Sequence, residues 1–251
     1  YYEFGPNEAI STHKESMSYV VQLAPGYRLF ALNDDTNYKP EGERGSGFSD
    51  DCMQWILEQL KDAQEQDQYV IAMTHHPMIA PSPFYAIIGK GDMQRNHETT
   101  RETFADAGLH CMLTGHTHVH NISSIVTKKG NVFYDIACGA MIGCPPGMRT
   151  ITFDPAHAKI DVDTTVIKEV PGLDTGGKPF DEYMKGFFFG MISEVIWAMG
   201  NDIDRLAEMT PAFSIPGEKV KKLAWLIKPI GKFINKLTFK KIWNICKKEY
   251  G

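Results

Sequence analysis

Histidines gather in the middle of the chain, where two pairs follow short apolar runs that are typical of buried strands. His75 and His76 come directly after the first run, and His116 and His118 follow the second. Seven of the nine histidines fall between positions 75 and 120. Imidazole is the most common protein ligand for transition metals, and side chains at strand ends of an α/β protein converge where such sheets bind ligands. The spacing therefore predicts a metal site.

The run Gly-His-Thr-His at 115–118 places two imidazoles two residues apart on an irregular turn. Both rings can point into one cavity and serve two adjacent ions. Gly115 is expected to permit the backbone bend, and Pro77 to stiffen the loop after the first histidine pair. The polar run at 33–37 offers further oxygen ligands, but Asn and Asp after a strand are more often turn formers, and we interpret them so.

The elements that must position these residues follow from hydrophobic periodicity and from turn and cap residues. We expect a hairpin over 18–32 that turns at Pro25-Gly26, a helix over 50–66 capped by Ser49, a strand over 69–74, a helix over 98–107 ending at Gly108, a strand over 110–114, and antiparallel strands over 121–127, 131–137, 149–153 and 160–167. This succession predicts an α/β (α+β) fold, a double β-sheet sandwich flanked by helices. The proline-rich loop over 78–96 is expected to act as a substrate-side lid.

The composition and periodicity of the sequence change near residue 174, where a Gly- and Pro-containing linker begins. We therefore predict a catalytic domain over 1–173 and a helical C-terminal domain over 174–251. One helix is expected over 181–207. A second begins near 218, with a single apolar stripe of residues that recur every three or four positions and a kink at Pro229.

The C-terminal tail, 216–251, is basic, and the rest of the chain is acidic. The tail has ten lysines and two glutamates, a net charge of +8, so the other residues carry −13 of the total of −5. Three interpretations stay open for the tail: packing on the catalytic domain, contact with an anionic membrane surface, and dimerisation. Nucleic-acid binding is not favoured, because the tail has no arginine and the body is acidic.

The segments Thr-His-His-Pro at 74–77 and Gly-His-Thr-His at 115–118 resemble the last two motifs of the calcineurin-like metallophosphoesterases, His-x-Pro and Gly-His-x-His. The resemblance covers residues 1–168. It implies two divalent or trivalent metal ions (Fe, Mn or Zn), with His75 and His116 on one ion and His118 on the other. It also implies hydrolysis of a phosphomonoester or phosphodiester by a metal-bound hydroxide, with His76 as a candidate catalytic residue on the phosphate side.

The chain departs from the family in its carboxylates. The earlier family motifs, Asp-x-His, Gly-Asp-x-x-Asp and Gly-Asn-His-Asp/Glu, do not occur. We therefore expect a fold that is incomplete at its N-terminus, and a missing N-terminal segment or second chain that completes the metal site for a small-molecule phosphate ester. The alternative is a non-catalytic or regulatory fragment that keeps the fold and part of the metal site, associated with a membrane.

Cysteine usage bears on the compartment. The five cysteines are widely spaced and form no Cys-x-x-Cys motif, which favours a reducing, cytoplasmic environment. The chain starts at Tyr1 without an initiator methionine, as a trimmed chain would. An extracytoplasmic location follows if a signal peptide was trimmed, so the sequence leaves localisation open. It also leaves the identity of the substrate open.

Overall fold

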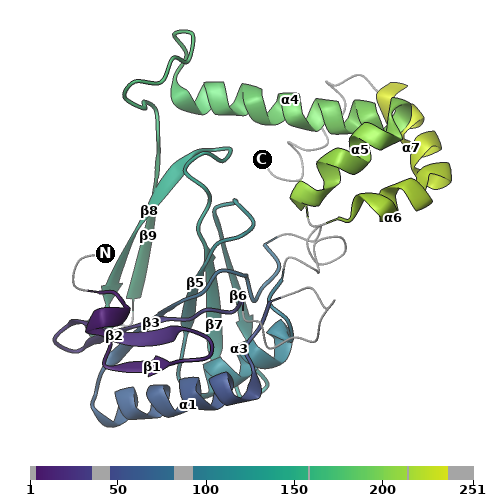
Figure 1. The fold of residues 1–251 in the computed structure, drawn as a ribbon. Coiled ribbons are helices and arrows are strands. Elements are labelled where there is room, and N and C mark those ends of the chain that lie inside the picture. The colour runs from purple at the N-terminus through teal and green to yellow at the C-terminus, as the bar shows by residue number, and fades with distance from the viewer. Residues whose placement is uncertain (1–3, 36–45, 82–92, 158, 214, 237–251) are drawn as a thin grey trace. The chain divides into compact units, whose positions relative to one another are not determined.

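The computed structural model of the chain describes residues 4–35, 46–81, 93–157, 159–213 and 215–236. Its helices and strands (Figure 1) are, in order, η1 Pro6–Glu8, β1 Ser11–His13, β2 Ser18–Ala24, β3 Tyr27–Ala31, α1 Asp50–Glu65, β4 Tyr69–Met73, α3 His97–Asp106, β5 Cys111–Thr114, β6 Asn121–Val126, β7 Val132–Ala137, β8 Gly147–Asp154, η3 Pro155–His157, β9 Lys159–Val166, α4 Phe180–Asn201, α5 Ile203–Met209, η4 Thr210–Phe213, α6 Gly217–Lys222 and α7 Ala224–Lys236. The predicted lid over 78–96 falls largely outside the described residues.

Seven strands form one sheet in the order β1-β2-β3-β4-β5-β7-β6. The predicted hairpin is confirmed: β2 and β3 pair antiparallel and turn at Gly26, whose φ of +83° suits a residue without a side chain. Strands β3, β4, β5 and β7 are mutually parallel, and β6 pairs antiparallel with β7 at the edge. The expected antiparallel pairing of the later strands is confirmed for β6 with β7 and for β8 with β9, and β7 in addition pairs parallel with β5.

Helices α1 and α3 cover one face of this sheet (Figure 1). Ile56 and Leu60 of α1 and Phe104 of α3 pack with Phe30 of β3 and Phe133 of β7, all of them buried. Helix α1 begins as predicted at the Ser49 cap, whose hydroxyl oxygen accepts a hydrogen bond from the amide of Cys52 at 3.2 Å. The fold is thus α/β, a multi-stranded sheet flanked by helices.

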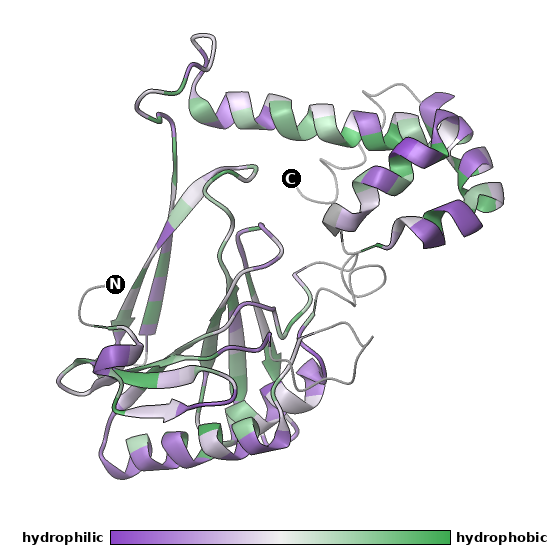
Figure 2. Ribbon diagram, in the orientation of Figure 1, coloured by the Kyte–Doolittle hydropathy of each residue, from purple (hydrophilic) through white to green (hydrophobic). Residues whose placement is uncertain are grey.

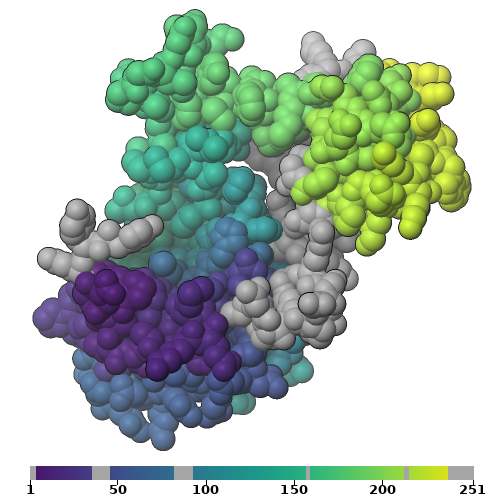
Figure 3. Space-filling model, viewed as in Figure 1, coloured from purple at the N-terminus to yellow at the C-terminus, as the bar shows by residue number. Residues whose placement is uncertain are grey.

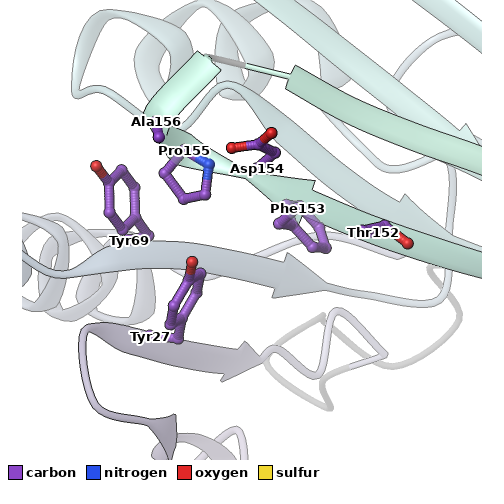
Figure 4. A pocket seen from close by; sticks show the side chains of 7 residues that line it. All are labelled: Tyr27, Tyr69, Thr152, Phe153, Asp154, Pro155 and Ala156. Carbon is purple, nitrogen blue, oxygen red and sulfur yellow. The ribbon is translucent and has the colours of Figure 1, made fainter.

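A second, smaller sheet consists of β8 and β9, which pair antiparallel along their whole length. A cavity of about 740 Å³ lies between it and the large sheet, and Leu60 and Gln64 of α1 contribute to its lining. Figure 4 shows the end of this space, where Tyr27 of β3 and Tyr69 of β4 face Phe153 and Pro155. The ring centroids of the two tyrosines are 5.6 Å apart.

The chain divides into two compact units, Tyr1–Asp181 and Glu182–Gly251. In the second unit α5, α6 and α7 form one group (Figure 3). The small core of the unit consists of Ile203, Leu206 and Ala207 of α5, Val220 of α6 and Ala198 of α4. Helix α4 is mainly hydrophobic and α6 mainly hydrophilic (Figure 2). None of the helices among the described residues has the length and hydropathy needed to cross a bilayer.

Two expectations for the helical unit were wrong. The single helix over 181–207 ends at Asn201, because Asp202 leaves the helical conformation and its carboxylate accepts a hydrogen bond from the Arg205 amide at 3.0 Å, capping α5. The second helix, expected as one from near residue 218, is divided at Leu223 into α6 and α7; Pro229 lies inside α7, and its expected kink stays a prediction. The expected single stripe is consequently split between two helices.

Candidate metal centre

The histidine segments lie at the carboxyl ends of neighbouring parallel strands. His75 and His76 follow β4, and His116 follows β5. Backbone hydrogen bonds continue past the strand ends: the Thr74 amide donates to the Leu113 carbonyl at 3.0 Å, and the next bond, 2.9 Å long, joins the amide of residue 115 to the His75 carbonyl. Because this pairing persists, the two segments are held side by side at one edge of the sheet.

His75, His76 and His116 form a compact cluster in which each residue offers one ligand atom within 4.8 Å of the other two. Nε2 of His75 and Nδ1 of His116 are 3.1 Å apart. Two nitrogens bound to one ion at about 2.1 Å are separated by about 3.0–3.4 Å for bond angles between octahedral and tetrahedral values. These two nitrogens are therefore spaced as ligands of a single transition-metal ion.

The backbone of the second segment is bent at the histidines themselves. His116 and His118 have φ values of +62° and +56°, in the left-handed region, whereas Gly115 does not. The Thr117 amide donates to the carbonyl of residue 115 at 2.7 Å, which closes a tight turn. The expectation that Gly115 supplies the bend was wrong. Left-handed φ at non-glycine residues carries a strain that is characteristic of functional sites.

A buried carboxylate orients His76. Asp34 lies just after β3, is 0% exposed, and accepts hydrogen bonds from the His76 amide at 3.0 Å and from the His76 ring Nδ1 at 3.1 Å. With Nδ1 turned to the carboxylate, Nε2 keeps its lone pair for the cluster. Metal-ligating histidines commonly have such a partner, which fixes the tautomer and the ring orientation.

The sequence interpretation missed Asp34 because it treated the run at 33–37 as a turn. The available signal was positional: Asp34 follows a strand of the same sheet that carries the histidines, so it reaches the same edge. Of that run, residues 36 and 37 lie outside the described residues.

Electrostatics keep the first histidine neutral. Burial lowers the pKa of His75, and a positive charge on His76 or His118 would lower it further, while Asp34 and Asp35 oppose the shift. A neutral imidazole is the form that binds metal. His118 itself is exposed and lies outside the three-histidine cluster, so its role as a ligand of a second ion stays a prediction.

Asp135 of β7 is hydrogen-bonded to residues that adjoin both histidine segments. It is 2% exposed, and one carboxylate oxygen accepts hydrogen bonds from the amides of Met78 at 2.6 Å and Ile79 at 2.9 Å, while the other accepts one from the hydroxyl of Thr114. Arg101 adds a hydrogen bond to the Met78 carbonyl at 2.9 Å. Burial raises the pKa of the Asp135 carboxyl, because the low-dielectric interior disfavours its charged form.

Within the described parts of the chain, no carboxylate joins the three histidines as a direct ligand. Imidazoles alone suit one ion held with moderate affinity, and a pair of ions requires bridging oxygen ligands of the carboxylate type. The residues of the cluster thus fit one metal ion.

Comparison with protein-family models gives no match, and no curated protein matches the sequence. Among solved structures, the chain is similar to a dimetal phosphatase from Danio rerio, with 16% sequence identity and a TM-score of 0.40. The match covers 53% of this chain and 52% of that one, so the chain spans about half the length of that structure.

Proposed function

We propose that this chain contributes to the metal-dependent hydrolysis of a phosphate ester, either a monoester or a diester. One observation carries the proposal: His75, His76 and His116 converge at the carboxyl edge of parallel strands, with ligand atoms within 4.8 Å of one another and those of His75 and His116 spaced for one ion. Metal ions at such a site neutralise charge on phosphoryl oxygens and lower the pKa of bound water to about 7.

The positions of the histidines suggest which of them would bind metal. His75 and His116 would hold an ion, and His76, oriented by Asp34, would complete its imidazole ligands. The Asp34 contact favours a ligand role for His76 over the catalytic role expected from the sequence. His118, exposed beside the cluster, is the candidate ligand for a second ion.

We further propose that the missing carboxylates come from a polypeptide segment outside these 251 residues, which packs on the open face of the large sheet. Parallel strands are normally covered on both faces. In this sheet Tyr69, Ile122 and Tyr134 are 51%, 48% and 42% exposed on the face opposite the helices. The cavity of about 740 Å³ under β8 and β9 borders the same face. His110 lines this cavity at the amino ends of the strands, so a segment that fills it would have to continue along the open face to deliver side chains to the histidine edge.

The test begins with calorimetric titration of the intact 251-residue chain with Mn²⁺ and Zn²⁺. We expect about one equivalent of ion to bind, and H75A and H116A to weaken binding at least tenfold, because each removes one of three ligands. H110A is the matched control, since His110 is an exposed histidine that precedes β5, at the opposite end of the strand from the cluster. Equal binding by all variants would rule out the cluster as the metal site.

Turnover of p-nitrophenyl phosphate and bis(p-nitrophenyl) phosphate then tests the chemistry. We expect little hydrolysis by the chain alone and metal-dependent hydrolysis by an extended chain that carries the proposed further segment. Two bound ions together with hydrolysis by the chain alone would refute the need for a further segment. An extended chain that binds two ions and cleaves neither ester would refute the function and leave a non-catalytic role.

A further inference from the structure

Helix α7 has two apolar faces, and among residues 4–236, as far as they are described, only one of these faces packs on other side chains. Toward the other helices, Ile227 packs on the small core of the helical unit, and the Asn235 side chain donates a hydrogen bond to the Ile196 carbonyl of α4 at 2.8 Å. At the crossing, a side-chain carbon added to Gly231 would lie 2.4 Å from the backbone nitrogen of Gly200. The two backbones are therefore in direct contact, which fixes the rotation of α7 about its axis.

The opposite face of α7 carries large apolar side chains in solvent. We call it the outer face; it consists of Trp225, Leu226, Ile230 and Phe233, which are 75%, 45%, 46% and 66% exposed. At about 100° per residue these four positions span an arc of about 140°. Exposed apolar side chains that are contiguous on a helix mark an interaction surface, whereas single ones do not.

The charge around the outer face is strongly positive. From Gly217 to Lys236 there are six lysines and one glutamate, a net charge of +5. Lys228, Lys232 and Lys236 recur every four residues along α7, so they form a row beside the outer face. Of the six lysines, Lys221 pairs with an aspartate of α5 at 3.0 Å. An apolar face with two aromatic residues beside a row of lysines is the composition of helices that lie in the headgroup region of a membrane.

We propose that the outer face of α7 binds the surface of an anionic phospholipid bilayer, with the helix parallel to the membrane plane. Trp225 and Phe233 enter the boundary between headgroups and acyl chains, and the row of lysines contacts lipid phosphates. The proposal does not depend on the metal site, because every residue that carries it lies in the helical unit. It selects one of the three interpretations that the sequence left open for the basic tail.

Flotation of the intact chain with vesicles tests the proposal. We expect binding to vesicles of phosphatidylcholine with 30% phosphatidylglycerol in 0.15 M salt, and weak binding to phosphatidylcholine alone. Each lysine near an anionic surface strengthens binding about fivefold, so K228Q/K232Q/K236Q should weaken binding to the anionic vesicles by about 100-fold and leave binding to neutral vesicles unchanged. Salt at 0.5 M should reproduce this loss.

The contribution of the apolar side chains is tested with W225S/F233S, which should reduce binding at least tenfold on both vesicle types. Both side chains are mostly in solvent, so unchanged circular dichroism is expected. The matched control is I10S/M17S, which removes two side chains that are 53% and 72% exposed in the other unit.

Equal loss in the control and test variants, or absence of binding to anionic vesicles, would overturn the proposal. A chain that is dimeric by light scattering and becomes monomeric in W225S/F233S, without vesicle binding, would also overturn it and assign the outer face to a second copy.

Discussion

Replacement of Asp135 tests how the two histidine segments are held. In D135A the amides of Met78 and Ile79 lose their acceptor in a buried site. A buried donor without a partner costs about 1–3 kcal/mol, so the two amides together should reduce the free energy of unfolding by about 3 kcal/mol. The Thr114 hydroxyl adds less, because it can rotate toward another acceptor.

The isosteric change D135N is the informative comparison. Its amide oxygen can accept from both backbone amides, and its NH₂ group can donate to the hydroxyl oxygen of Thr114. Since burial raises the pKa of Asp135, its ionised form is already disfavoured in the folded chain, and loss of the charge should cost less than about 1 kcal/mol at pH 7. The wild type should gain stability relative to D135N as the pH falls through the raised pKa, because the folded state then binds the proton more tightly than the unfolded state.

Urea unfolding gives the global value, and hydrogen exchange of the 74–81 segment gives the local one. A loss of 3 kcal/mol corresponds to exchange that is faster by about 100-fold in D135A. D163A, at an exposed aspartate of β9, is the control and should change neither measurement. If D135A and D135N differ by less than about 0.5 kcal/mol, the Asp135 carboxylate does not satisfy these amides and the reasoning fails.

Three further predictions concern single side chains. D34N should weaken metal binding by about 10–100-fold, because it removes the carboxylate that orients His76; D35N at the exposed neighbour is the titration control, and equal effects would exclude an orienting role. Burial raises the pKa of Cys111 to about 11 from 9.0, so at pH 8 its thiolate is about 100-fold scarcer than that of an ordinary cysteine. Alkylation of Cys111 by iodoacetamide, followed by mass spectrometry, should be slower by at least that factor in the folded chain and should accelerate as the pH rises toward 11; a rate equal to that in urea would contradict this. S49A should lower the free energy of unfolding by about 1 kcal/mol through loss of the α1 cap, measured in urea, whereas S49D should retain most of it.

The sequence was sufficient where structure is determined locally. The hairpin at Gly26, the Ser49 cap and the helix end at Gly108 each depend on the conformational or hydrogen-bonding preference of one residue, and each is present in the structure. The two histidine segments were recognisable for the same reason, since each directly follows its own strand. Their convergence required only that β4 and β5 be neighbours.

What the sequence could not provide depends on pairings between distant segments. Asp34 and Asp135 acquire their roles from partners that are 42 and up to 57 residues away along the chain. A buried carboxylate has no periodic signature, and its partners appear only when the strand order is known. The break at Leu223 is similarly non-local, because packing of Val220 and Ile227 into one small core sets the geometry of α6 and α7.

The order of strands in the large sheet has a consequence for the timing of folding. The histidine cluster lies on β3, β4 and β5, which are adjacent both in the sheet and in the chain, and the last residue that holds it is Asp135 of β7, 19 residues after His116. The closure entropy of each crossover rises only with the logarithm of its length, so these contacts are inexpensive to form early. Synthesis of the 114 residues from 138 to 251, after the end of β7, takes about 10 s at typical rates. The three imidazoles can therefore be assembled, and exposed to metal in the cell, while the helical unit is still being synthesised.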